Sequence, residues 1–225
     1  MAPDGAQVFG ADRLTSARKD AVTQALTVEQ PAPGRRHVPE RPPLLAVGVM
    51  IWLGSELMFF SGLFAAYFTI RAHAATWPLL QGQKLDYVQA GIFSVILLVS
   101  SPTFQLGVWA QERGERRKAK AWIYTSFILG AGFVANTLYE WHDFASSHHG
   151  PGLNAYWSLF FVMTGIHGLH VTLGLIAMIF LLGRLRGPAG DPGETNVYQA
   201  VGYYWHFVDF MWVGIFSCLF LLKSG

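Results

Sequence analysis

The sequence predicts an all-α integral membrane protein, a bundle of five transmembrane helices preceded by a soluble N-terminal tail. Of its 225 residues, 52% are hydrophobic and only 13% are charged, whereas soluble domains usually carry about 25% charged residues. Five apolar segments each exceed the roughly 20 residues that a helix needs to cross a bilayer core about 30 Å thick. The segments do not alternate in polarity over about 10 residues, as the strands of a membrane barrel do. Only helices and closed barrels satisfy their backbone groups in lipid, so we expect helices.

Residues 1–43 differ from the rest of the chain and form the predicted tail. They combine six basic and five acidic residues with five prolines beyond residue 30. No apolar core of the signal-peptide type follows Met1. A segment so polar and rich in proline does not bury enough apolar surface to fold alone. We therefore expect a cytoplasmic, mobile tail.

Residues 44–225 form the predicted membrane domain. With five spans, thirteen basic residues lie on one side of the membrane and three on the other. Basic residues near spans favour the cytoplasmic side. The N-terminus is therefore predicted inside and the C-terminus outside. The spans are expected at about 44–70, 88–111, 121–142, 155–183 and 197–222.

Ionisable side chains inside these spans are the candidate functional residues, because each costs about 2.5–3.5 kcal/mol to insert and normally faces a bundle interior. Glu56 lies in the first span, and His167 and His170 lie in the fourth. Glu56 is about 18 Å from the inner end of its span, and His170 is at a similar depth. Because pairing lowers the cost of burial, we predict that Glu56 and His170 approach each other or share a polar, lipid-lined cleft. The alternative is that each bonds to a neighbouring backbone or hydroxyl group.

His206 and Asp209 form a second polar pair, in the last span. They are three residues apart and so share one helical face, where Asp209 can accept a hydrogen bond from a histidine. We expect a structural pair that locks this helix, or a contact with a partner subunit; a proton relay is a further possibility. The glycines Gly54, Gly62, Gly165, Gly168 and Gly174 are expected to permit close helix approach.

A metal or haem site in this chain is not expected. His167 and His170 lie on adjacent turns of one helix, so they cannot clamp opposite faces of one haem. The surroundings carry no motif rich in residues that would orient metal ligands. Cys218 is the single cysteine, which excludes an internal disulfide and a cysteine-based cluster. The basic residues sit in short loops and not on one soluble face, so no nucleic-acid partner is predicted.

Four strings carry a resemblance to a known family: WLGSELMFFSGLFAAYF (52–68), YEW (139–141), TGIHGLHVTLG (164–174) and YYWHFVDFMW (203–212). They resemble, in order, segments of cytochrome c oxidase subunit III, the third subunit of the haem-copper oxidases. The first string is similar to the helix that bears the family's buried glutamate. The matches cover most of 44–222 and none of the tail. The long form of the family has seven spans, so this chain resembles its shorter, five-helix bacterial form.

The resemblance implies a non-redox subunit III of an aa3-type cytochrome c oxidase, a proton-pumping oxidoreductase. Such a subunit packs on subunit I, stabilises it, and supports proton uptake and lipid or oxygen access while oxygen is reduced to water. It holds no catalytic residue, and haem and copper belong to partner subunits, among them subunits I and II. Bound phospholipid is expected, and Glu56 and His170 match polar residues of the family. The implied location is the inner (plasma) membrane of a bacterial cell.

Two alternatives remain open from the sequence. The chain is also similar to the corresponding subunit of a quinol oxidase or of a nitric oxide reductase relative, because other subunits select the electron donor. A protein of another class, a free-standing membrane carrier, is disfavoured because the sequence shows no inverted repeat and no paired broken helices.

Overall fold

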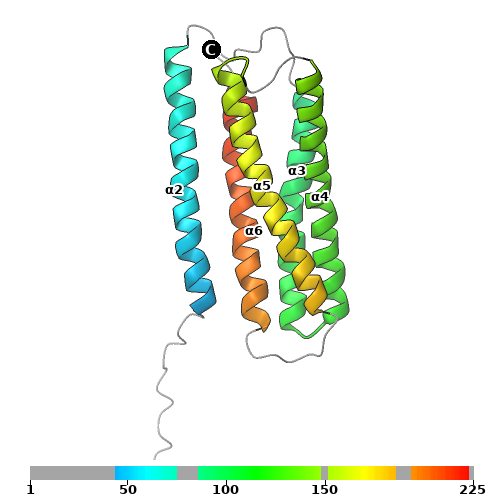
Figure 1. Cartoon of the computed structure of the whole chain (residues 1–225). Coiled ribbons are helices and arrows are strands. Elements are labelled where there is room, and N and C mark those ends of the chain that lie inside the picture. The colour runs from blue at the N-terminus through cyan, green and yellow to red at the C-terminus, as the bar shows by residue number, and fades with distance from the viewer. Residues whose placement is uncertain (1–43, 75–85, 148–151, 186–193, 223–225) are drawn as a thin grey trace, which may run out of the picture. The chain divides into compact units, whose positions relative to one another are not determined.

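The computed structural model describes residues 44–74, 86–147, 152–185 and 194–222, and the predicted tail lies outside these residues. The described part folds into five long helices with no strand (Figure 1). All five are long and apolar enough to cross a membrane, so the predicted all-α bundle of five transmembrane helices is confirmed. The elements are α2 (Leu44–His73), α3 (Tyr87–Glu112), α4 (Arg116–Ser146), α5 (Ala155–Arg184), α6 (Glu194–Phe216) and the short π-helical turn η1 (Ser217–Leu221).

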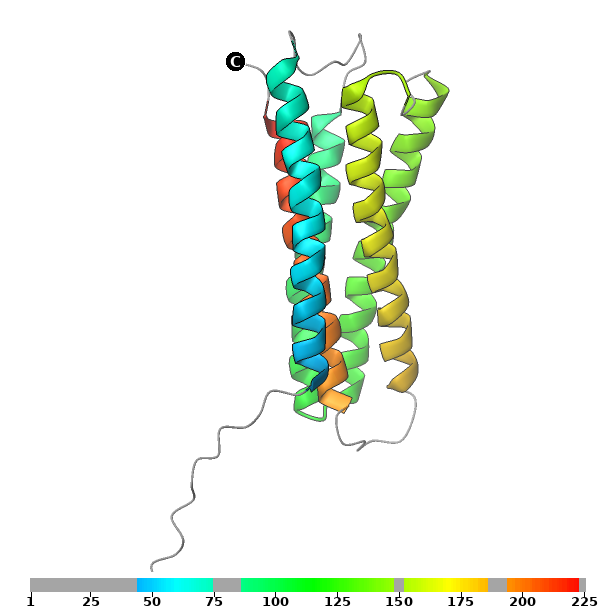
Figure 2. The same cartoon turned by 60° about the vertical axis from the view of Figure 1, so that its left-hand side comes forward.

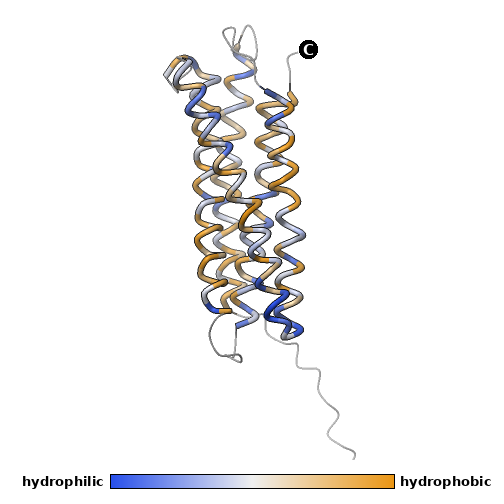
Figure 3. Tube along the Cα trace, turned by 90° about the vertical axis from the view of Figure 1, so that its right-hand side faces the viewer, coloured by the Kyte–Doolittle hydropathy of each residue, from blue (hydrophilic) through white to orange (hydrophobic). Residues whose placement is uncertain are grey.

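The helices extend beyond the predicted spans mainly at α4, which begins at Arg116 and not near 121. A helix can continue past the hydrocarbon core, because its backbone bonds are internal whether lipid or water surrounds it. Figure 3 shows this arrangement, with hydrophilic stretches toward the helix ends and hydrophobic residues along most of the middle. The turn between α3 and α4 needs a glycine, because Gly114 has a φ of +75°.

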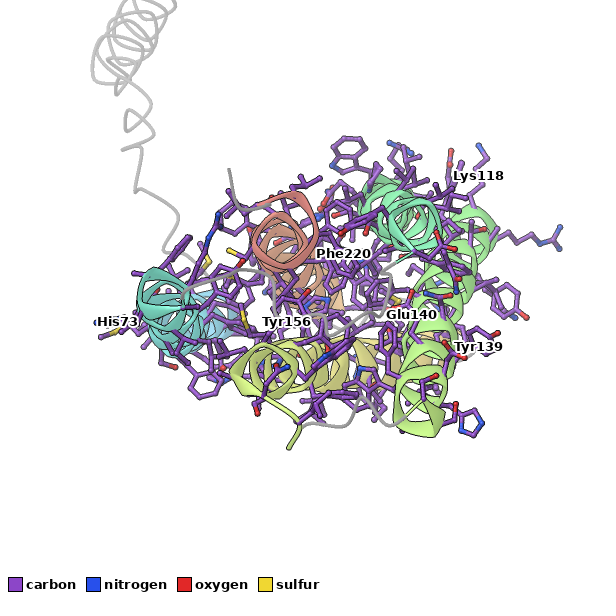
Figure 4. The ribbon with its side chains drawn as sticks, turned by 90° about the horizontal axis from the view of Figure 1, so that it is seen from above. His73, Lys118, Tyr139, Glu140, Tyr156 and Phe220 are labelled. Carbon is purple, nitrogen blue, oxygen red and sulfur yellow. The ribbon has the colours of Figure 1, made fainter. Side chains whose placement is uncertain are left out.

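Four of the helices, α3 to α6, pack as a tight bundle. The most extensive helix pair is α3 with α4, and α6 also packs along α3, α5 and α2. Seen from above, α3 and α6 lie on one side of the bundle and α5 on the other, with α2 at one end (Figure 4). The core between the end of α4 and the start of α5 is aromatic: Phe144, Trp157 and Phe160 pack ring against ring. The Tyr156 hydroxyl donates to the carbonyl of Leu219 in the same layer.

Helix α2 stands at the edge of this bundle (Figure 2). Only three of its 30 residues are buried, Leu53, Phe60 and Tyr67. They are seven apart, so they form one narrow stripe along the helix. The rest of α2 exposes apolar side chains, as expected for a surface that faces lipid or another protein.

The expected packing role of the glycines holds for two of the five. A Cβ on Gly174 would lie 2.6 Å from the Trp205 ring, and one on Gly165 would lie 2.8 Å from Trp141. The expectation is wrong for Gly54, Gly62 and Gly168, where a Cβ would meet nothing within 4 Å. Gly168 lines a cavity between α4 and α5, and Gly54 and Gly62 face open space in the described part of the chain.

Candidate functional site: polar pairs between the helices

Glu56 of α2 and His170 of α5 meet inside the membrane-spanning region. The Glu56 Oε2 atom lies 3.2 Å from His170 Nε2, so the predicted approach of these two side chains is present. The other ring nitrogen, His170 Nδ1, lies 2.8 Å from the carbonyl oxygen of Ile166. A carbonyl only accepts, so Nδ1 carries a proton. One further proton then lies between Glu56 and His170, on the carboxyl group or on the imidazole.

Aromatic rings enclose this pair. Trp52 of α2 stacks on Tyr204 of α6 with ring centroids 5.3 Å apart and planes 8° apart. The Tyr204 hydroxyl donates to the carbonyl of His170 at 2.8 Å. Phe60 packs against the His170 ring at 5.3 Å. The three rings join α2, α5 and α6 around a single ionisable pair.

A cavity of about 350 Å³ lies between α2, α5 and α6, next to the Trp52–Tyr204 stack. Its size is within the range of about 300–1,000 Å³ typical of ligand pockets. Its lining offers almost no polar group, so its chemistry suits an apolar chain. The lining residues are Leu45, Val49, Trp52, Leu173, Ala177, Val197, Ala200, Val201 and Tyr204.

His167 does not join the Glu56–His170 pair and faces the interior of the tight bundle. Its ring stacks on Trp212 at 4.9 Å and meets the edge of Phe133 at 5.8 Å. Neither ring nitrogen has a hydrogen-bond partner among the described residues. The side chain is 1% exposed, so it acts here as a packing group with unused polar capacity.

His206 bonds across to α3 and not along its own helix. Its Nδ1 is hydrogen-bonded to the Ser101 hydroxyl, and its Nε2 lies 3.0 Å from Gln105 Oε1. Asp209 is 4% exposed, and its carboxylate lies near the Ser101 hydroxyl and forms no hydrogen bond with His206. The bond that Asp209 could accept from His206 is therefore not formed. Ser101 and Gln105 were missed by sequence reasoning, because lone Ser and Gln residues are common in spans and only the register of α3 against α6 selects them.

Further hydrogen bonds continue along the same α3–α6 seam, which we define as the line where these two helices meet. Trp205 Nε1 donates to Ser100 at 3.0 Å, and Gln199 donates to Glu112 at 2.9 Å. Hydrogen bonds spaced along both helices, of which Trp205 to Ser100 is buried, fix the register of α3 against α6. Two more bonds of the seam join Trp212 to Ser94 and Thr195 to Gln111.

The end of the bundle at which α4 and α6 begin is closed by an ion pair. Arg116 at the start of α4 lies 2.9 Å from Glu194 at the start of α6, and Glu194 is 7% exposed. Arg116 lies before the predicted third span, at about 121–142, but belongs to helix α4. Within the described residues, no three His, Cys, Asp or Glu side chains are grouped as metal ligands.

Five helices long and apolar enough to cross a membrane, joined by packing and by polar contacts such as Glu56–His170, define the class: an integral membrane protein. A family model named cytochrome c oxidase subunit III matches residues 29–224. The chain belongs to this family.

Curated relatives agree with this assignment. A protein of Mycobacterium tuberculosis named probable cytochrome c oxidase subunit 3 is 42% identical over 192 residues, which cover 84% of this chain and 93% of the relative. A protein of the same name from Nocardia farcinica is 40% identical over 190 residues, covering 84% and 93%. The quinol oxidase subunit 3 of Bacillus spizizenii is 32% identical over 179 residues, covering 80% and 87%.

Proposed function

We propose that this chain is the non-redox subunit III of an aa3-type cytochrome c oxidase. The complex reduces oxygen to water with electrons from a cytochrome c and pumps protons. This chain packs on subunit I, which holds the haem and copper centres together with subunit II. The observation that carries the proposal is the Glu56–His170 contact on the two strings most typical of the family, in a chain that matches the family over residues 29–224.

In this proposal the chain supports subunit I indirectly, in two ways. The tight bundle gives subunit I a rigid neighbour. The cavity between α2, α5 and α6 holds a phospholipid acyl chain, because its walls are apolar and lipid tails are the apolar chains available at that depth. The Glu56–His170 pair beside it keeps a proton available inside the membrane, which suits support of proton uptake or oxygen access through lipid.

The orientation follows from charge. Arg113, Arg116, Arg117, Lys118 and Lys120 lie at the α3–α4 turn, and such clusters stay on the cytoplasmic side. The proposal therefore places this turn and the N-terminus in the cytoplasm and the C-terminus outside, in a bacterial inner (plasma) membrane.

Co-purification tests the proposal as a whole. The chain is tagged, extracted in a mild detergent, and its companions are identified by mass spectrometry and optical spectra. We expect a haem-bearing large subunit and a subunit with a dicopper site. A companion set without any haem protein would contradict the proposal.

A quinol oxidase is the second candidate, because the Bacillus spizizenii relative carries that name. The same preparation distinguishes the two. A dicopper centre in a co-purified subunit, with oxidation of a reduced cytochrome c, supports the first function. Oxidation of a quinol by a complex without dicopper supports the second.

The acyl-chain site has its own test. Ala177 lines the cavity, and Ala177→Phe would fill part of it. Native mass spectrometry of the complex should then show less bound phospholipid. Ile176→Phe is the matched control, because Ile176 is 57% exposed and its change leaves the cavity open. Equal lipid retention in both variants would contradict the site.

A further inference from the structure

The α3–α6 seam carries a polar patch near the middle of the membrane, made of Ser101, Gln105 and His206. We take the midpoint of each helix as the midplane. Gln105 then lies about 8 Å from it, and Ser101 and His206 lie about 2 Å from it, at 1.5 Å per residue. All three side chains are only partly buried. A polar patch is thus open to the outside of the bundle at a depth where lipid offers only hydrocarbon.

The carboxamide of Gln105 keeps unused hydrogen-bonding capacity. One of its two polar atoms bonds to His206 Nε2 at 3.0 Å. The other has no hydrogen-bond partner in the described residues, yet it is not enclosed by the protein. Turning the amide over exchanges its oxygen and its NH₂ group, and either group then faces outward. In both orientations a strong hydrogen-bonding group points away from the bundle.

Three Ser and Thr hydroxyls on exposed faces of the spans do not share this feature. The hydroxyl of Thr125 on α4 donates to the carbonyl of Ala121 in its own helix. The hydroxyls of Ser55 and Ser61 on α2 do the same to Trp52 and Leu57. Such groups need nothing from outside, whereas the Gln105 amide does.

Lipid headgroups are too far away to satisfy the amide. The hydrocarbon core extends about 15 Å from the midplane, so Gln105 lies about 7 Å inside its boundary. The amide is bonded to His206, which lies nearer the midplane, so the Gln105 side chain is turned away from that boundary. The missing partner is therefore a polar group of another membrane-spanning protein segment.

Large apolar side chains surround the patch. Trp109 is 47% exposed one turn from Gln105, and Phe210 is 69% exposed one turn from His206. Leu98 on α3 and Val213 on α6 are 39% and 45% exposed on the same two helix faces. Aromatic anchors around a polar centre are typical of interface hot spots. In Figure 4, α3 and α6 lie on the same side of the bundle and can meet one partner together.

We propose that the α3–α6 seam docks a transmembrane helix of the catalytic oxidase subunit, which presents a polar side chain or a free backbone carbonyl to Gln105 within the membrane. This inference rests on the proposed function for the identity of the partner. The face itself is chosen by the unpaired amide and by the aromatic side chains around it.

Photo-crosslinking in native membranes tests the face. Phe210 is replaced by p-benzoylphenylalanine, which keeps an aromatic ring at that position. Ile128 on α4, 50% exposed, receives the same probe as a control. We expect a crosslink from position 210 to the haem-bearing subunit, identified by mass spectrometry, and none from position 128. Crosslinks to that subunit from 128 and not from 210 would overturn the inference and leave the proposed function intact.

A second variant tests the amide. Gln105→Leu keeps the size of the side chain and removes its polar group. One interhelical hydrogen bond in lipid corresponds to a factor of about ten in dissociation, so the purified complex should lose this subunit about tenfold faster in detergent. Thr125→Val is the control, because that hydroxyl is satisfied within its own helix, and it should leave the loss unchanged. Equal loss from the two variants, with the position 210 crosslink absent, would refute the docking face. Absence of any haem-bearing companion in the wild-type preparation would instead refute the proposed function.

Discussion

Helices α2 and α6 are both long and apolar enough to cross a membrane, yet they have opposite roles in packing. Three of the 30 residues of α2 are buried, whereas eleven residues of α6 are buried. α6 contacts three other helices, and α2 packs mainly against one. Hydrophobicity shows that a segment enters the membrane, but it does not show whether the segment lies at the centre or the edge of a bundle.

The two helices are also held by different means. α6 is fixed by a series of hydrogen bonds to α3 and by buried aromatic rings such as Trp205. α2 is held by one narrow stripe and by three specific contacts: Glu56 with His170, Trp52 with Tyr204, and the Tyr67 hydroxyl with the carbonyl of Cys218. Loss of one contact should therefore loosen α2 locally, whereas damage to α6 should unfold the whole bundle.

The largest expected effect is at Trp205. Its side chain is fully buried, so Trp205→Ala should lower the free energy of unfolding by about 3–5 kcal/mol. Denaturant unfolding in detergent micelles measures this. Phe210→Ala on the exposed face of the same helix should change the stability of the isolated chain by less than about 0.5 kcal/mol. Similar losses in the two variants would show that α6 is not the packed centre.

Two glycine substitutions compare the packing against α6 with the packing of α2; Gly174 lies on α5 and faces Trp205 of α6. Gly174→Ala puts a Cβ 2.6 Å from the Trp205 ring, so it should destabilise the fold by about 1–3 kcal/mol. Gly62→Ala on α2 meets nothing within 4 Å and should be neutral or stabilise α2 by up to about 1 kcal/mol. Thermal unfolding of the two variants measures the difference in stability between them. A destabilising Gly62→Ala in the isolated chain would mean that α2 packs more closely than described.

Glu56→Ala removes the polar link between α2 and α5. It leaves His170 Nε2 without its partner, so we expect a loss of about 1–3 kcal/mol, seen as faster hydrogen exchange in α2 than in α4. In the complex, the haem and copper spectra should remain unchanged, and inactivation during turnover should become faster. Unchanged exchange, turnover and lifetime would remove Glu56 from the functional residues.

Tyr67→Phe is the smallest of these changes. It removes one buried hydroxyl that donates to the carbonyl of Cys218 and keeps the ring in place. The expected loss is about 1 kcal/mol, confined in hydrogen exchange to the C-terminal half of α2 and to η1. Exchange that increases throughout α3 and α4 would show that α2 is coupled to the whole bundle and is not an edge helix.

The sequence predicted the fold class and one contact of the site, because both depend on composition and depth. The similar depth of Glu56 and His170 in their spans was the basis for predicting that they approach each other. It could not reveal that His206 bonds to Ser101 and Gln105, because this depends on how α3 is rotated against α6. It also could not separate Gly174, which faces Trp205, from Gly54, which faces open space.

We propose that this chain holds no electrons and acts through buried polar pairs and packing. The most direct test of this proposal is the visible spectrum of the chain after separation from its companions. The account predicts no Soret absorption from the isolated chain, while the companion fraction retains all the haem. A Soret band in stoichiometric amount with the isolated chain would contradict it.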